Sequence, residues 1–307
     1  MRDPVLPSDL AHMAMQQHPN YASTIETLGG KVQHLTCHDG AKPLGHVQIL
    51  RRKLGPLQVA WVPRGPVWTP DISPSDKREM WAQMRQTLPR RSLHLVTPNS
   101  QADADLLHTM SYRQIARGQS FASLDLTSPK TARLAAQHGK WRNRLRHAQN
   151  ADLRIESRAF HPLQDTHLLQ LERKQRRTRG YRALPMAFTQ AWATTNPRAT
   201  RLFVASQGHD MVGFVLILVH APSASYHIGW SNAAGRKASC HNLLLWRAAN
   251  WVADQGVETL ELGLVDPAEA PGLTRFKLGM GAQLHHTGPT MIALPRLHLP
   301  KLWPRAA

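Results

Sequence analysis

The chain has 307 residues, and its 38 Lys and Arg against 20 Asp and Glu give a formal net charge of +18. This length predicts two packed units of about 150 residues each, and the charge predicts an anionic partner such as RNA, a nucleotide-linked precursor or an anionic membrane surface. No apolar run approaches the roughly 20 residues of a membrane-spanning helix, and residues 1–7 (MRDPVLP) lack the apolar core of a secretion signal, so we expect a soluble cytoplasmic protein. Cys37 and Cys240 form no disulfide framework and are expected to be free thiols.

The first half of the chain alternates strands and helices. Ser73 or Ser75 can cap the first long helix. Hydrophobic periodicity predicts, in order, strands over residues 31–37, 44–50 and 57–62, a helix over 73–88, a strand over 92–97, a helix over 102–110 and a strand over 119–126.

The second half repeats this order after a long polar helix over residues 127–152 and two further helices near 167–177 and 185–194. Apolar residues at helical spacing mark a helix over residues 239–254. Around it the pattern predicts strands over 201–205, 211–219 and 225–230, a strand over 258–262, a helix over 272–279 and a last strand over 283–293.

Strands interleaved with helices indicate mixed α/β units. The fold expected is α/β (α+β), with two tandem units that are each a mixed, mainly antiparallel sheet flanked by helices. We place the N-terminal unit at residues 1–127 and the C-terminal unit at residues 128–307, the latter including a basic connecting helix over 128–152. The element order of the second half is the order expected of a GNAT fold.

Three segments carry a family resemblance. Residues 272–281 (GLTRFKLGMG) resemble a Leu-x-Arg-Phe-Lys-x-Gly-Phe-Gly signature of FemA/FemB-type transferases, which are relatives of the GNAT acetyltransferases. Residues 62–67 (VPRGPV) are similar to an early segment of that family, and residues 140–148 (KWRNRLRHA) to its central basic helix. The three segments occur in the family's order. The resemblance implies two GNAT-like units, of which the first is degenerate and the second catalytic.

Lys277 is the predicted catalytic residue. Acyl transfer to an amine develops negative charge on a carbonyl oxygen, which a fixed cation stabilises, and the resemblance implies that the lysine of the Phe-Lys pair lies at the reaction centre. A solvated lysine that favours a helix C-terminus is the structural alternative. Arg275, two residues away, is expected on another side of the helix, where it would bind a phosphate.

Further arginines are predicted to bind substrate phosphates. Arg142 and Arg146 lie four apart on a helix whose apolar stripe includes Trp141 and Leu145, so they present two guanidinium groups in one direction. Arg64 follows a strand between two prolines and a glycine, which fix the backbone and aim the side chain. A solvated charged face and a turn arginine are the alternatives. Six cations over residues 173–182 also suggest an electrostatic path for a nucleic acid such as tRNA.

Cofactor signals are weak. Residues 232–239 (NAAGRKAS) precede a helix where GNAT enzymes hold the coenzyme A pyrophosphate, but they contain one glycine, and FemA/FemB-like proteins do not use coenzyme A. His34 and His38 do not converge on a metal when they lie in a strand and turn, and no acidic cluster accompanies His285 and His286. We expect no bound cofactor and no metal.

These observations favour an acyltransferase that moves an activated aminoacyl or acyl group to a primary amine. The resemblance implies aminoacyl-tRNA as donor and a cell-envelope or peptidoglycan-type acceptor, with a phosphate-bearing substrate held by the arginines. The first alternative is an acyl-CoA-dependent N-acyltransferase. The second is a non-catalytic RNA-binding protein.

Overall fold

The computed structural model describes residues 13–40, 42–55, 57–89 and 92–294 and divides the chain into two compact units. Among these residues the first unit comprises 30–118 and 287–294, and the second unit comprises 13–29 and 119–286. The expected boundary between residues 127 and 128 therefore differs from the structure, because residues 119–127 belong to the second unit and residues 287–294 return to the first. Residues 1–7, on which the expectation about a secretion signal was based, lie outside the described part.

The first unit is a seven-stranded sheet with two long helices. Its strands follow the order β1-β2-β3-β5-β14-β6, with β4 paired to β2; only β3 and β5 are parallel in this sheet. Side chains of α2 and α3, among them Trp81 and Leu107, bury the apolar face of the sheet. The elements are β1 (Lys31–Asp39), β2 (Lys42–Leu54), β3 (Leu57–Pro63), β4 (Val67–Trp68), α2 (Pro74–Thr87), β5 (Ser92–Thr97), α3 (Gln101–Thr109), β6 (Arg113–Ala116) and β14 (Thr290–Ala293).

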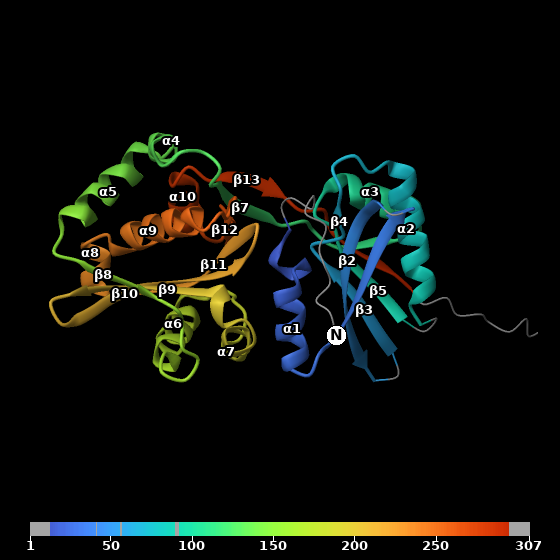
Figure 1. The fold of residues 1–307 in the computed structure, drawn as a ribbon, viewed down its shortest axis with the longest axis horizontal. Coiled ribbons are helices and arrows are strands. Elements are labelled where there is room, and N and C mark those ends of the chain that lie inside the picture. The colour runs from blue at the N-terminus through green and yellow to red at the C-terminus, as the bar shows by residue number, and fades with distance from the viewer. Residues whose placement is uncertain (1–12, 41, 56, 90–91, 295–307) are drawn as a thin grey trace, which may run out of the picture. The chain divides into compact units, whose positions relative to one another are not determined.

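The second unit holds a seven-stranded sheet in the order β13-β7-β12-β11-β10-β9-β8. Figure 1 shows α5 and α9 on one face of this sheet and α6 and α7 on the other. Its helices are η1 (Met15–Gln17), α1 (Pro19–Thr27), α4 (Lys130–Ala135), α5 (Gly139–Asn150), α6 (Thr166–Arg179), α7 (Met186–Thr195), η2 (Pro197–Ala199), α8 (Ala233–Lys237), α9 (Cys240–Asp254) and α10 (Pro271–Gly279). Its strands are β7 (Ser120–Asp125), β8 (Arg154–Arg158), β9 (Thr200–Gln207), β10 (Asp210–His220), β11 (Ser223–Ser231), β12 (Thr259–Leu264) and β13 (Gln283–His286).

The sequence of β10 explains why both faces of this sheet are covered. Val215 and Ile217 pack in the core beneath α5 and α9, while Phe214 and Leu216 pack in the core beneath α6 and α7. Successive side chains of a strand point to opposite faces, so an uninterrupted apolar run requires a layer on each side. The expected mixed α/β fold of two sheets flanked by helices is confirmed.

Each half of the sequence contributes one strand to the sheet of the other half. The strand predicted over 119–126 is β7, which pairs with β12 and β13 in the second unit. The single strand predicted over 283–293 is two strands, β13 in the second sheet and β14 in the first. Between them lies Gly288, where a Cβ atom would be 2.5 Å from the carbonyl oxygen of Ser100.

The predicted long helix over 127–152 is broken into α4 and α5. The amide of His138, between the two helices, donates to the carbonyl oxygen of Gly279 at 2.9 Å. This hydrogen bond to the end of α10 replaces one within a continuous helix, and Gly139 begins the new helix. Ser73 caps α2 as predicted, since its side chain accepts a hydrogen bond from the amide of Asp76. None of the described helices is long and apolar enough to cross a membrane.

Candidate functional site around Lys277 and the separation of two parallel strands

The two basic residues of helix α10 lie on different sides of the helix. Pro271 occupies the first turn, where a missing amide costs nothing, and the helix ends at Gly279. Lys277 is buried and Arg275 is exposed, so the two cations face different surroundings. Gly279 is required by close packing, because a Cβ atom there would lie 3.1 Å from Cδ1 of Trp141 on α5.

The ammonium of Lys277 is held beside the end of β12. The residue is 5 % exposed, and Nζ donates a hydrogen bond to the carbonyl oxygen of Leu264 at 2.6 Å. A Cβ atom at Gly263 would lie 3.6 Å from Nζ, an ordinary contact, and the backbone φ of 80° is what favours glycine there. Burial lowers the pKa of Lys277 from 10.5 to about 8. The group is therefore mainly protonated at neutral pH, and two of its three N–H donors remain for a ligand.

The strands next to Lys277 part from each other. β11 and β12 are parallel and pair only over Ser223–Ser225 and Thr259–Glu261, although β11 continues to Ser231. On its other side β12 shifts register against β7 between Glu261 and Gly263. In open α/β sheets, ligands bind beyond the carboxyl ends of parallel strands where neighbouring strands separate. Lys277 lies at such a position.

A tyrosine and a histidine form a buried pair where β11 leaves β12. Tyr226 Oη lies 2.8 Å from His241 Nε2, and the ring of Phe276 lies edge-on to His241 with centroids 5.6 Å apart. Burial raises the pKa of Tyr226 and lowers the pKa of His241 to about 4, so both side chains are neutral at neutral pH. The two neutral groups share one hydrogen bond, whose direction is set by the histidine tautomer. Gly229 makes the pair fit, because a Cβ atom there would lie 2.6 Å from Tyr226 Oη.

A second polar network joins α6 to the same stretch of β11. Tyr181 Oη donates to Oε1 of the buried Glu172 at 3.1 Å. Nε2 of Gln175 donates both to Tyr181 Oη and to the carbonyl oxygen of Gly229, each at 3.2 Å. Neither this network nor the Tyr226–His241 pair was predicted. Tyr226 and His241 are fifteen residues apart, Gln175 and Gly229 are 54 apart, and no local pattern distinguishes these residues from ordinary core residues.

In the arginine-rich segment after Glu172, one arginine makes contacts within the protein and the other cations are exposed. Nε of Arg176 lies 3.9 Å from Oε1 of Glu172, and Nη1 of Arg176 donates to the carbonyl oxygen of Leu184. Gly180 ends α6 in the left-handed conformation, with φ of 72°. The remaining cations of the segment are exposed: Arg173, Lys174, Arg177, Arg179 and Arg182. An anion-attracting surface therefore remains after the helix terminus is stabilised.

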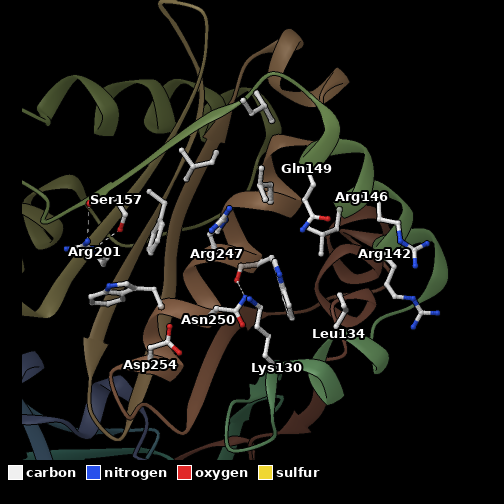
Figure 2. Close-up of a pocket in the computed structure, with 17 residues that line it drawn as sticks. Lys130, Leu134, Arg142, Arg146, Gln149, Ser157, Arg201, Arg247, Asn250 and Asp254 are labelled. Carbon is white, nitrogen blue, oxygen red and sulfur yellow. Dashed lines mark hydrogen bonds between the residues drawn. The ribbon is translucent and has the colours of Figure 1, made fainter.

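Arg142 and Arg146 extend from α5 as the spacing predicts. Trp141 and Leu145 are buried on the adjacent face of that helix, and Figure 2 shows both arginines pointing the same way. Nη1 of Arg142 donates to the carbonyl oxygen of Ala135 at 2.7 Å, and Nη1 of Arg146 donates to Asn143 Oδ1 at 3.4 Å. Both side chains line a groove described below. Phosphate binding by them stays a prediction.

Arg64 belongs to the first unit and is 6 % exposed. Its Nε and Nη2 donate to Asn99 Oδ1 at 3.4 and 3.2 Å. Its backbone has φ of 50°, a left-handed conformation that costs energy for a residue with a side chain and that concentrates at functional sites. The sharply fixed backbone was predicted, whereas burial against Asn99 was not. Its role in substrate binding stays a prediction.

The segment expected to resemble a pyrophosphate loop is the short helix α8. The Asn232 side chain accepts a hydrogen bond from the amide of Gly235 at 2.8 Å, and the amides of Arg236, Ala238 and Ser239 donate to carbonyl oxygens of the same segment. Backbone amides bind phosphate only when they point at it. Four amides here already have acceptors within the protein, and the acyl-CoA alternative stays a prediction.

Comparison with known proteins agrees with this fold. Residues 132–283 match the family model of the acetyltransferase (GNAT) domain. No curated protein matches the chain. The chain is similar in structure to FemX, with a TM-score of 0.78, 12 % identity and 93 % of each chain covered.

Two other solved structures share the architecture. A tandem GNAT protein from the clavulanic acid biosynthesis pathway has a TM-score of 0.53 and 14 % identity over 87 % of this chain and 83 % of that one. L-PGS from Bacillus licheniformis has a TM-score of 0.52 and 16 % identity over 94 % and 96 %. The chain therefore contains a GNAT acyltransferase domain, which includes Lys277, within a fold that it shares with FemX.

Proposed function

We propose that the protein transfers an aminoacyl or acyl group to a primary amine, with aminoacyl-tRNA as donor and a cell-envelope or peptidoglycan-type acceptor. The buried ammonium of Lys277 at the end of β12 carries this proposal, because an enclosed cation with two remaining donors suits a developing oxyanion. The FemX-like fold and the resemblance of residues 272–281 to FemA/FemB-type transferases support it.

The chemical step is a substitution at the donor's ester carbonyl. The acceptor amine attacks the carbonyl carbon, a C–N bond forms, and the carbonyl oxygen becomes an alkoxide next to Lys277. Collapse of this intermediate breaks the C–O bond of the ester. The attacking nitrogen loses one proton and the leaving hydroxyl gains one, so the products are an amide and the deacylated donor.

The other predicted residues act in binding. Arg142, Arg146, Arg64 and Arg275 would hold phosphates of donor or acceptor through charge-assisted hydrogen bonds. Arg275 is exposed on α10, two residues from the proposed catalytic lysine. No bound cofactor is needed for this reaction, because the donor arrives already activated.

The test compares two labelled donors. Purified protein is incubated with a mixed pool of radiolabelled aminoacyl-tRNA or with labelled acetyl-CoA, and with nucleotide-linked peptides that bear a free primary amine. We expect transfer from tRNA, and we expect Lys277→Ala to reduce turnover by roughly 10²–10³-fold with a smaller change in KM, as for removal of an oxyanion donor. Lys140→Ala, an exposed lysine on α5, is the matched control.

Each contrary outcome is informative. Transfer from acetyl-CoA alone would establish the acyl-CoA alternative. Binding of tRNA that weakens steeply with salt, together with no turnover and no effect of Lys277→Ala, would refute the proposed reaction. A change in KM alone would refute the oxyanion role and leave Lys277 as a binding residue.

A further inference from the structure

A groove of about 860 Å³ lies between α5, α9 and the strands β8 and β9 of the second unit (Figure 2). It follows α9 from Leu243 through Arg247 to Asp254. His241, which faces Tyr226, lies two residues before Leu243 on that helix. An α-helix has 3.6 residues per turn, so residues two apart point to nearly opposite sides of it. The groove therefore lies on a different side of α9 from the Tyr226–His241 pair.

The charge of the groove is strongly one-sided. Five cations line it against a single carboxylate, Asp254. Neither Arg247 nor Lys130 has a hydrogen-bond or ion-pair partner within the described part of the chain, and both are exposed. The five cations are Lys130, Arg142, Arg146, Arg201 and Arg247, and they come from four different elements. A net excess of four positive charges around one concavity favours an anionic occupant.

The floor of the groove is apolar and mainly aliphatic. Leu153 and Ile155 are half-buried there, and Leu134 at the rim is 40 % exposed. Trp246 is buried, and the guanidinium of Arg201 covers the ring of Trp251 at 4.7 Å. Arg201 is fixed in that place by Ser157, whose Oγ accepts from Nε at 2.7 Å. Aliphatic side chains therefore offer more open surface than aromatic faces.

This combination decides between two anionic partners. Single-stranded nucleic acid is bound by cations together with open aromatic faces on which bases stack. Here one tryptophan is buried and the other is covered by Arg201. Anionic lipid is bound by cations next to an apolar surface that contacts glycerol and the first methylene groups of the chains. The groove has both features of the second kind.

We propose that this groove docks the protein on anionic membrane surfaces by receiving the phosphate headgroup of a phospholipid. Arg247 and Lys130 bind the phosphate, and Leu134, Leu153 and Ile155 contact the apolar part next to it. The groove acts as a docking site. Arg142 and Arg146 also line it and are shared with the proposed substrate site, so the test below changes neither of them.

The experiment measures co-sedimentation of the full-length protein with vesicles of phosphatidylcholine that contain or lack phosphatidylglycerol. We expect binding only to vesicles with phosphatidylglycerol. Lys130→Glu/Arg247→Glu should weaken that binding by at least about tenfold, since two attractive charges at the surface become repulsive. The matched control is Lys140→Glu/Arg144→Glu, which makes the same charge change at exposed positions of α5 outside the groove, and it should bind within about twofold of the unchanged protein.

A second variant tests the apolar contact. Leu134→Ser, at an exposed position that should not disturb folding, is expected to weaken vesicle binding while leaving the dependence on phosphatidylglycerol. Inorganic phosphate and glycerol phosphate should fail to displace the protein at concentrations that match the lipid phosphate. Circular dichroism of every variant verifies folding.

Three results would overturn the proposal. Equal loss of binding in both double variants would show a non-specific response to total charge. Displacement by matched inorganic phosphate would show a site for free anions. Binding of a single-stranded RNA oligonucleotide that only Lys130→Glu/Arg247→Glu abolishes, with no binding to vesicles, would make the groove an RNA site.

Discussion

Replacing Lys277 by methionine is expected to stabilise the protein at neutral pH. Methionine fills a similar volume without a charge, whereas the buried ammonium is unfavourable enough to lower the pKa of Lys277 from 10.5 to about 8. That difference between the unfolded and folded protein corresponds to about 3 kcal/mol of lost stability near pH 7. The variant also loses the hydrogen bond to Leu264, which reduces this gain in stability by about 1 kcal/mol. The free energy of unfolding should therefore rise by roughly 2 kcal/mol.

The effect must depend on pH in a defined direction. Between the two pKa values the unfolded chain binds more protons at this lysine than the folded chain does, so the stability of the unchanged protein rises with pH. From about pH 7 to about pH 9.5, the free energy of unfolding of the unchanged protein should rise by roughly 2 kcal/mol relative to that of the methionine variant. The gain from Lys277→Met should therefore almost disappear at the higher pH. The contributions of other titrating groups to stability are the same in both proteins, so they cancel when the two are compared at each pH.

Urea unfolding at both pH values measures this difference, with Lys140→Met as the control for an exposed lysine. A gain in stability that is the same at both pH values would refute the argument from burial of the charge. A methionine variant that is less stable at both would show that the ammonium contributes more through its contacts than it costs through burial. Retained turnover in Lys277→Met would separately refute the catalytic role.

The remaining predictions concern pH and packing. Turnover should fall as pH rises through about 8, because Lys277 loses its proton there, and a pH profile of kcat that stays flat to pH 10 would contradict a role for the cation. Gly235→Ala should lower the free energy of unfolding by about 3 kcal/mol in urea, because its Cβ atom would lie 2.2 Å from the carbonyl oxygen of Val212; an unchanged midpoint would contradict this contact. Tyr226→Phe should cost about 1–3 kcal/mol in the same measurement, because it leaves Nε2 of the buried His241 without its hydrogen-bond partner. If Tyr226→Phe and Tyr226→Phe/His241→Phe lower the free energy of unfolding equally, the unpaired nitrogen of His241 is not the cause.

Sequence periodicity predicted most of the elements, because burial on a sheet or helix leaves a local pattern. The alternation in residues 92–97 and the helical spacing in residues 239–254 both correspond to elements of the structure. Short or exposed elements were missed. All four residues of β6 are exposed, so the strand carries no apolar alternation, and β8 has five residues.

The pairing of strands could not be predicted from local pattern. β7 and β14 have the same alternation whichever sheet receives them, so the pattern identifies each strand without its partner. The break between α4 and α5 was missed for a related reason. Its cause is the hydrogen bond from His138 to Gly279, which joins residues far apart in the sequence.

The candidate site was predictable only where residues lie together in the chain. The signature around Lys277 is continuous, so the sequence proposes the lysine and its neighbour Arg275 as site residues, and their roles stay predictions. Tyr226 and His241 come from a strand and a helix fifteen residues apart. Only the folded chain brings them together, and nothing in their local sequence predicts the contact.

The exchanged strands have a consequence for synthesis of the protein. β14 lies between β5 and β6 in the first sheet, yet it is translated after every other described strand. While the ribosome is still adding residues, β5 and β6 therefore lack the partner that joins them and expose unpaired edges, which are liable to aggregate. A fragment of residues 1–127 would keep that gap permanently and would also carry β7 without its neighbours. The amino-terminal half should thus need the finished polypeptide, or a chaperone, before it can close.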